Sequence, residues 1–200
     1  MAKIKRTKVE LKSQREALKR FERYLPMLLL KKQQLQVEIQ SISAQIEAVE
    51  KREQAARDNV RSWTRLLAEP IDIEELIVPE TVQTSEGNIA GVPIPVLDEV
   101  RFRDVDVDLF ASPPWVDDAQ DTVRTLVRMR IEREILEEQR RRVQEELRVT
   151  TQRVNLFEKV KIPECKEHIR VIKIFLGDEQ TAGVARGKIA KRRSTTQEAA

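Results

Sequence analysis

Three aspartates at alternate positions, Asp104, Asp106 and Asp108, are the carboxylates whose spacing comes nearest to that of a cation site. An EF-hand calcium loop that begins at Asp104 requires glycine at position 109 and glutamate at position 115. The sequence has Leu109 and Trp115 at these positions. Because alternate residues of a β-strand share one face, we expect the three carboxylates to form a solvated acidic face and predict no metal site there.

The sequence carries one cysteine, Cys165, and one histidine, His168, which leaves little for metal binding or acid–base chemistry. A structural zinc site needs four ligands, and a disulfide needs a second cysteine. Gly183 and Gly187 precede Lys188, but their spacing is not that of a phosphate-binding loop, and the sequence contains neither GxSxG nor HExxH. We therefore expect no catalytic residue, no cofactor and no metal, and predict a non-enzymatic chain.

Charge is distributed unevenly along the 200 residues, although the net charge is only +3. Between Glu69 and Asp118 there are 13 acidic and 2 basic residues, which leaves 35 basic against 21 acidic residues elsewhere. No aromatic residues interleave with the basic ones as a stacking platform, so we do not expect direct binding of nucleic acid. The basic residues near the termini are Lys3, Lys5, Arg6, Lys8, Arg186, Lys188, Lys191, Arg192 and Arg193.

The composition favours an elongated helical protein over a compact globule. Charged residues make up 36% and aromatic residues 4% of the chain, whereas a typical soluble domain is roughly 25% charged. The first twelve residues lack the apolar segment of a signal peptide, and the longest uncharged apolar-rich stretch, Ile89–Leu97, has nine residues. Because a membrane span needs about 20 apolar residues, we expect a cytoplasmic protein that meets a membrane only indirectly.

Apolar residues recur at alternating steps of three and four from Leu11 to Leu67, and fourteen of these seventeen positions are apolar. This heptad pattern predicts a coiled-coil helix that begins at a capping box over Thr7–Glu10 and ends before Pro70. A second stripe predicts a helix of similar length that begins near Ser112. The steps also fall on the charged residues Lys32, Glu53, Arg133 and Arg140. The predicted seam residues are Leu18, Phe21, Leu25, Leu28, Leu35, Ile39, Ile42, Ile46, Val49, Val60, Leu136, Val143, Leu147, Val154 and Phe157.

An antiparallel hairpin is the simplest way to pair two helices of matched length that carry apolar stripes and are joined by one connector. An intermolecular coiled coil is the alternative. The predicted fold is therefore all-α: a long antiparallel two-helix coiled coil with a small β-hairpin in its connector. The helices would occupy residues 1–69 and 112–177, the acidic connector residues 70–111, and a partly flexible basic tail residues 178–200. Both termini would then lie at one tip, where the basic residues of the two ends would meet.

The two prolines inside the helices are expected at nearly the same height in this hairpin. Pro26 interrupts the first helix, and Pro163 lies where the second seam slips in phase after Phe157 and resumes at Cys165. An interior proline removes a helix hydrogen bond. The coincidence predicts one shared bend or register adjustment, with two independent kinks as the alternative. Gly177, after the last seam residue, predicts the end of the second helix.

The connector contains two stretches of β-type residues, residues 89–97 and 100–109. The second alternates cleanly between apolar and polar residues, which is typical of a strand. We expect a small hairpin with its turn near Leu97–Val100, whose first strand is confined to an edge by its prolines.

The run Met27–Leu30 is more apolar than a two-helix seam requires. Leu28 can point into the seam, but Leu29 and Leu30 point elsewhere. These leucines either pack around a bend at Pro26 or form an exposed apolar surface for a surrounding partner.

Taken together, the sequence resembles the D subunit of the V-type rotary ATPases and ATP synthases. The resemblance rests on Asn88, Ile89, Ala90, Gly91 and Val92 followed by Pro95, on Arg153, Val154 and Asn155 leading to Pro163, and on Leu25–Pro26 in the first helix. These motifs occur in the family's order over about 170 residues. The sequence departs from the family after Gly177, where two further glycines interrupt the helical pattern.

The resemblance implies a central rotor stalk that transmits torque between a catalytic hexamer of A and B subunits and a membrane rotor ring. The implied partners are the A and B subunits, the F subunit and a funnel-like subunit that joins the ring. The terminal basic tip would enter the hexamer, and the chain would couple ATP synthesis or hydrolysis to H⁺ or Na⁺ transport. One alternative is a free coiled-coil scaffold whose basic tip binds nucleic acid or an acidic protein, and a second is an accessory arm of an enzyme that acts through its connector.

Overall fold

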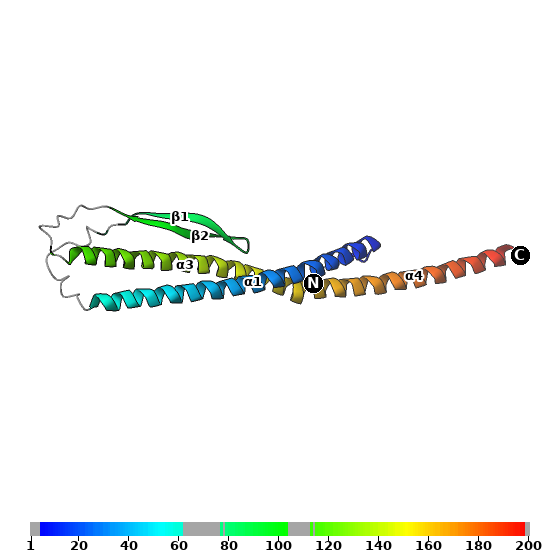
Figure 1. The fold of residues 1–200 in the computed structure, drawn as a ribbon. Helices are drawn as coiled ribbons and strands as arrows, with labels where there is room; N and C mark the ends of the chain where they lie inside the picture. The colour runs from blue at the N-terminus through cyan, green and yellow to red at the C-terminus, as the bar shows by residue number, and fades with distance from the viewer. Residues whose placement is uncertain (1–4, 62–76, 78, 104–112, 114, 199–200) are drawn as a thin grey trace. The chain divides into compact units, whose positions relative to one another are not determined.

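The computed structural model describes residues 5–61, 77, 79–103, 113 and 115–198 of the chain. Its elements are the helix α1 (Lys8–Arg61), the strands β1 (Pro79–Ile89) and β2 (Val92–Phe102), the helix α3 (Val116–Leu156), the π-helical turn η2 (Phe157–Lys161) and the helix α4 (Ile162–Glu198) (Figure 1). The prediction of long helices with one small β-hairpin is confirmed. The chain divides into two compact units, residues 31–149 and residues 1–30 with 150–200.

The first helix begins at the predicted cap. The Glu10 amide donates to the Thr7 hydroxyl (3.2 Å), and the Leu11 amide donates to the Thr7 carbonyl (3.0 Å). Only this half of the predicted capping box is formed among the described contacts, because the Glu10 carboxylate instead accepts a hydrogen bond from the Gln14 amide (2.8 Å). The predicted end of this helix, residues 62–69, lies outside the described residues.

In the unit of residues 31–149, α1 and α3 run antiparallel within one chain. Two ion pairs join the helices, Lys31–Glu146 (2.6 Å) and Arg52–Glu132 (3.0 Å). From the first pair to the second, the residue number increases along α1 and decreases along α3, as it does in an antiparallel pair. The helices bury a shared core between these ion pairs, so the seam of this unit is satisfied without a second chain. Its buried helical residues are Leu35, Ile42, Ile46, Val49, Leu136 and Val143.

The β-hairpin turns at Ala90–Gly91, and the predicted turn at Leu97–Val100 was wrong. Ala90 and Gly91 both have positive φ, 51° and 83°. Two successive left-handed residues form the tight turn whose twist matches that of paired strands. The Asn88 side-chain oxygen accepts from the Gly91 amide (2.9 Å) and braces the turn. The residues predicted to turn lie instead inside β2, where Leu97 pairs with Thr84 and Val100 with Val82.

The hairpin packs against the two helices through its second strand (Figure 1). Val92 and Ile94 are buried in the same core as the helix seam. The prolines in this strand have no N–H, but their carbonyls bind α3: Gln139 donates to the Pro95 oxygen (2.6 Å) and Arg142 to the Pro93 oxygen (3.3 Å). The hairpin is therefore fixed by apolar burial and by side chains of α3.

In the other unit, the start of α1 pairs antiparallel with η2 and α4. The rings of Phe21 and Phe157 lie 5.0 Å apart, and Glu22 pairs with Lys166 (3.5 Å). Further toward the N-terminus, the guanidinium of Arg6 lies 5.4 Å from the centre of the Phe175 ring. Val154, Cys165 and Ile172 are buried in this unit.

The slip in the second seam coincides with the π-helical turn. Eight residues separate Phe157 from Cys165, where a heptad pattern takes seven. In η2 the Ile162 amide bonds to the Phe157 carbonyl, five residues back. Such a turn holds one residue more than an α-helical turn, which is the number needed to bring Cys165 back to the buried side. The second helix therefore adjusts its register directly before Pro163.

Every predicted seam residue is shielded from solvent to some degree. Seven are buried: Leu35, Ile42, Ile46, Val49, Leu136, Val143 and Val154. Eight are half-buried: Leu18, Phe21, Leu25, Leu28, Ile39, Val60, Leu147 and Phe157.

The ends of the second helix differ from the prediction. Its first described turn begins at Val116, whose amide bonds to the Pro113 carbonyl (3.1 Å), and Ser112 lies outside the described residues. At the other end, the predicted stop at Gly177 was wrong, because α4 continues to Glu198. Gly177, Gly183 and Gly187 each cost about 1 kcal/mol relative to alanine inside α4, and the Ala, Glu, Gln, Lys and Arg residues between and after them favour helix.

Candidate partner-binding surfaces

The described residues contain no group of three or more His, Cys, Asp or Glu that could hold a metal ion. Cys165 is buried, and its burial together with the nearby Glu164 carboxylate raises the pKa of the thiol, so it is a poor nucleophile. The acidic triplet Asp104, Asp106 and Asp108 lies outside the described residues. The candidate sites among the described residues are exposed surfaces and a shallow groove.

One such surface is the end of α4, which we call the terminal overhang (residues 177–192). Every residue of the overhang is exposed, and Figure 1 shows α4 continuing past the start of α1. Arg6 lies over Phe175, whereas Arg186 is eleven residues further along α4, about 16 Å at 1.5 Å per residue. The overhang is a single helix about 24 Å long with all of its faces accessible.

The predicted basic tip is consequently divided into two separate groups. Lys5, Arg6 and Lys8 lie at the start of α1, and Arg186, Lys188, Lys191 and Arg192 lie on the overhang. The prediction that they meet was wrong because the second helix does not end at Gly177. Lys3 lies outside the described residues, and so does the side chain of Arg193. The overhang also exposes Val184 (61%) and Ile189 (55%), so its surface is basic with isolated apolar positions.

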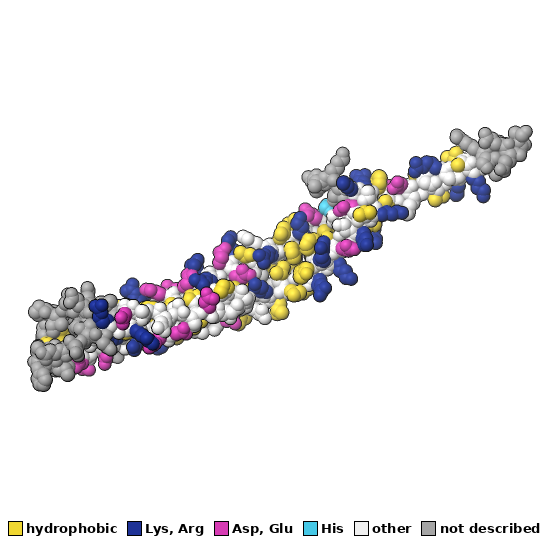
Figure 2. Space-filling model, turned by 90° about the horizontal axis from the view of Figure 1, so that it is seen from above, with side chains coloured by type: hydrophobic (Ala, Val, Ile, Leu, Met, Phe, Trp, Pro, Cys, Tyr) yellow, Lys and Arg dark blue, Asp and Glu magenta, His cyan; other side chains and the backbone are white. Residues whose placement is uncertain are grey.

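A second surface surrounds α1 at Tyr24, Met27, Leu29 and Leu30, which we call the apolar collar. Leu29 and Leu30 are 45% and 58% exposed, so they do not pack away around Pro26 but form an exposed apolar surface. Leu156 (44%) and Val160 (42%) add exposed apolar side chains from α3 and η2. Figure 2 shows a band of hydrophobic side chains flanked by Lys and Arg side chains.

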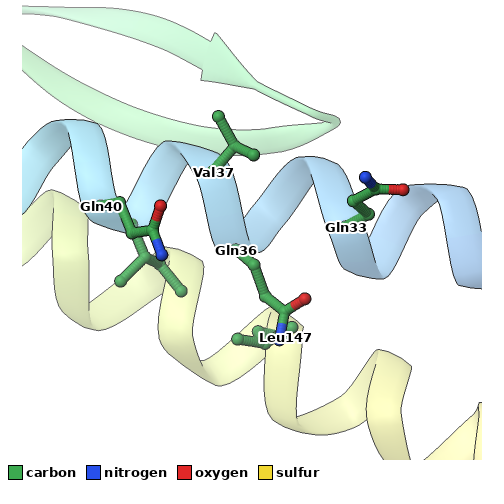
Figure 3. Close-up of a pocket in the computed structure, with 6 residues that line it drawn as sticks. Gln33, Gln36, Val37, Gln40 and Leu147 are labelled. Atoms are coloured by element: carbon green, nitrogen blue, oxygen red, sulfur yellow. The ribbon is translucent and has the colours of Figure 1, made fainter.

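A shallow groove of about 440 Å³ lies between α1 and α3 in the unit of residues 31–149. Its lining combines apolar side chains with three glutamine amides, and Figure 3 shows the Gln36 amide beside Leu147. Amides without charge offer hydrogen bonds to a peptide backbone but no charge selectivity. The lining residues are Gln33, Gln36, Val37, Ile39, Gln40 and Leu147.

The motif residues of the sequence lie at the backbone irregularities of the fold. Asn88, Ala90 and Gly91 make the hairpin turn, Ile89 and Val92 flank it and pack on the core, and the Pro95 carbonyl binds α3. The second motif leads into η2: Val154 is buried, and its neighbours Arg153 and Asn155 are exposed. Pro163 follows directly after η2. These residues therefore shape the backbone and are not gathered into one site.

The described part of the chain is a helical hairpin with extended exposed surfaces, which defines the class of antiparallel coiled-coil proteins. No described helix is long and apolar enough to cross a membrane. The family model of the ATP synthase D subunit matches residues 10–192, and the chain belongs to this family.

Relatives match over nearly their whole length. The chain is 44% identical over 191 residues to the V-type ATP synthase D subunit of Borreliella burgdorferi, covering 96% of this chain and 95% of that protein. It is 34% identical over 197 residues to the protein of the same name from Chlamydia caviae, covering 95% and 93% of the two chains. With that of Chlamydia pneumoniae it shares 31% identity over 193 residues, covering 95% and 92%.

Proposed function

We propose that this chain is the central rotor axle of a V-type ATPase or ATP synthase. As a non-catalytic subunit, it transmits torque between the catalytic A/B hexamer and the membrane rotor ring. Rotation of the axle couples ATP synthesis or hydrolysis to the transport of H⁺ or Na⁺. Membership of the D-subunit family supports this role, and so does the pairing of long helices by an apolar core, which resists bending and twisting.

The observation that carries the proposal is the terminal overhang. A helix about 24 Å long whose residues are all exposed gains little stability from burial, since isolated helices of this length are marginal in water. A cavity inside the hexamer would enclose it. Arg186 and Lys188 would meet carboxylates or backbone carbonyls of the cavity wall, and Val184 and Ile189 would meet its apolar side chains.

The remaining partners are assigned by family resemblance. The F subunit binds the axle, and a funnel-like subunit joins the connector end of the axle to the membrane ring. The protein therefore lies on the cytoplasmic side and is peripheral to the membrane as part of the complex.

Reconstitution tests this proposal. The purified full-length chain is mixed with the F subunit and the A/B hexamer, and the mass by gel filtration is recorded with the rate of ATP hydrolysis. We expect one copy in each hexamer and a changed rate. A chain truncated before Gly177 loses the exposed residues 177–192 and the residues after them. The circular dichroism of the truncated chain should still be that of a folded helical protein, but the chain should bind the hexamer more weakly.

A folded full-length chain that ignores the hexamer would overturn the axle proposal. The free-scaffold alternative would then be tested with an RNA or DNA duplex at rising salt, because a complex held by phosphate contacts weakens steeply with ionic strength. Binding that survives high salt would speak against that alternative as well.

A further inference from the structure

We infer that an enclosing partner surrounds the axle and contacts it at the apolar collar. The wall of this partner is apolar where it meets the collar and acidic beside it. This inference rests on the proposed function, which identifies the partner as the A/B hexamer around the axle. It goes beyond that function by naming the residues at which the ring touches the axle.

The directions of the collar side chains argue for a partner that encloses α1. At about 100° per residue, Leu30 points nearly opposite the side of α1 that carries the seam residue Leu25. Tyr24 and Leu29 lie on the two flanks of the seam, and Met27 lies between Tyr24 and Leu30. Over these two turns α1 is apolar all round, a pattern typical of a helix that is buried on every side. In this unit only the seam side is covered by described residues.

A partner docked on one face would leave part of the collar in water. If it covered Tyr24 and Met27, the flank with Leu29 would stay exposed. Because apolar contacts are not directional, a ring around the collar can hold an axle while the axle turns. Hydrogen bonds and ion pairs at the same place would favour particular orientations and resist rotation.

The charges beside the collar argue for an acidic partner. Five exposed basic side chains on α1, α3 and η2 make no ion pair with any described residue: Lys19, Arg20, Arg23, Arg153 and Lys159. Of the neighbouring carboxylates, Glu22 is paired with Lys166, whereas Glu158 has no described partner. The excess positive charge disfavours a second copy of this chain, because two such collars would repel each other. Carboxylates on the wall of the enclosing ring would neutralise it.

Site-specific crosslinking in the reconstituted complex of this chain with the A, B and F subunits tests the inference. The variants Met27→p-benzoylphenylalanine and Leu30→p-benzoylphenylalanine carry the photocrosslinker in two different directions. We expect both positions to crosslink to A or B. Crosslinks from one position only, or crosslinks only to the F subunit or to a second copy of this chain, would overturn the inference.

Affinity gives a second readout with a matched control. Leu29→Gln and Leu30→Gln together should weaken binding to the hexamer at least about tenfold, because two apolar contacts are lost. Val82→Gln, on β1 and about as exposed as Leu29 (43% and 45%), should change the affinity less than about twofold. All variants replace exposed side chains, so their thermal unfolding should match the parent. Equal affinities for collar and control variants would refute the inference.

Gel filtration of the same samples distinguishes failure of the collar contact from failure of the axle role. If the parent chain does not enter the hexamer, the proposed function fails. If it enters the hexamer but the collar makes no crosslink to A or B, the axle proposal stands and the collar inference fails.

Discussion

Replacement of Glu53 by glutamine should destabilise the helical hairpin more than any exposed charge change on α1. Glu53 lies at a seam position with a side chain only 7% exposed. Its carboxylate lies between Arg57, bonded at 2.5 Å, and Arg133 of the facing helix, at 3.5 Å. Glu53→Gln keeps the shape of the side chain but removes the negative charge that both guanidinium groups share.

The size of the effect follows from what remains exposed to water. Removing one partner of a buried ion pair costs about 3–5 kcal/mol. Arg57 is 57% exposed and can be hydrated again, and Arg133 is 29% exposed and keeps Glu137 at 3.7 Å. We therefore expect a loss of about 2–3 kcal/mol in the free energy of unfolding. For a chain of this size, the midpoint of thermal unfolding should fall by about 4–12 °C.

Circular dichroism at rising temperature and in guanidinium chloride measures this loss. Glu50→Gln is the matched control, because Glu50 is an exposed residue of the same helix with no described ion pair, and its change should stay within about 0.5 kcal/mol. Equal midpoints for Glu53→Gln and Glu50→Gln would refute the reasoning.

A double replacement separates stability from register. Glu53→Leu combined with Arg133→Leu removes both charges, and buried pairs exchanged for apolar residues are often neutral or stabilising. We expect near-parent stability but a broader distribution of distances between spin labels on α1 and α3, because apolar seams permit sliding. A distribution as narrow as that of the parent would show that the pair does not specify register.

Three further predictions concern local features. Deleting Glu158 should convert η2 to α-helix and leave Pro163 in a helix interior, which costs about 3 kcal/mol. Adding Pro163→Ala to the deletion should recover this stability. A deletion that leaves thermal unfolding unchanged would contradict this account. Ala90→Gly should relieve the left-handed strain of the turn (φ 51°) by up to about 1 kcal/mol, seen as slower hydrogen exchange of the hairpin amides. Hydrogen bonds from Arg141 and Arg142 lower the pKa of Glu138 to about 2, so Arg141→Gln should raise it toward 4.5 in an NMR titration; because the folded-state pKa is depressed, the small stabilisation is present above pH 4.5 and is lost as pH falls toward 2.

The regular part of the fold could be predicted from the sequence because it depends on one repeating property. Burial at steps of three and four is set by helix geometry, so the seam residues from Leu18 to Phe157 follow from the pattern. The slip between Phe157 and Cys165 also marked η2, although the pattern could not say whether a bend or an extra residue absorbs it.

The ends and turns could not be predicted in the same way, because competing local preferences decide them. The turn fell at Ala90–Gly91, where alanine adopts a conformation that it rarely favours, braced by Asn88 and by packing of Val92 and Ile94 on the helices. The helix passed through Gly177 because one glycine lowers helix stability by only about 1 kcal/mol and does not by itself end a helix. That difference separated the two basic groups and left the overhang exposed.

The polar interruptions of the seam carried a signal about register that apolar periodicity alone does not contain. Glu53 and Arg133 break the stripe in their own helices, and the structure places them against each other across it. Opposite charges at buried positions must meet, because a buried charge without a partner is strongly destabilising. Only a few registers of the two antiparallel helices bring such charges together. The exposed pair Arg52–Glu132, one residue away on both helices, favours the same alignment. An apolar seam thus provides the stability of this hairpin, and its charged interruptions select one register among those that the seam alone would allow.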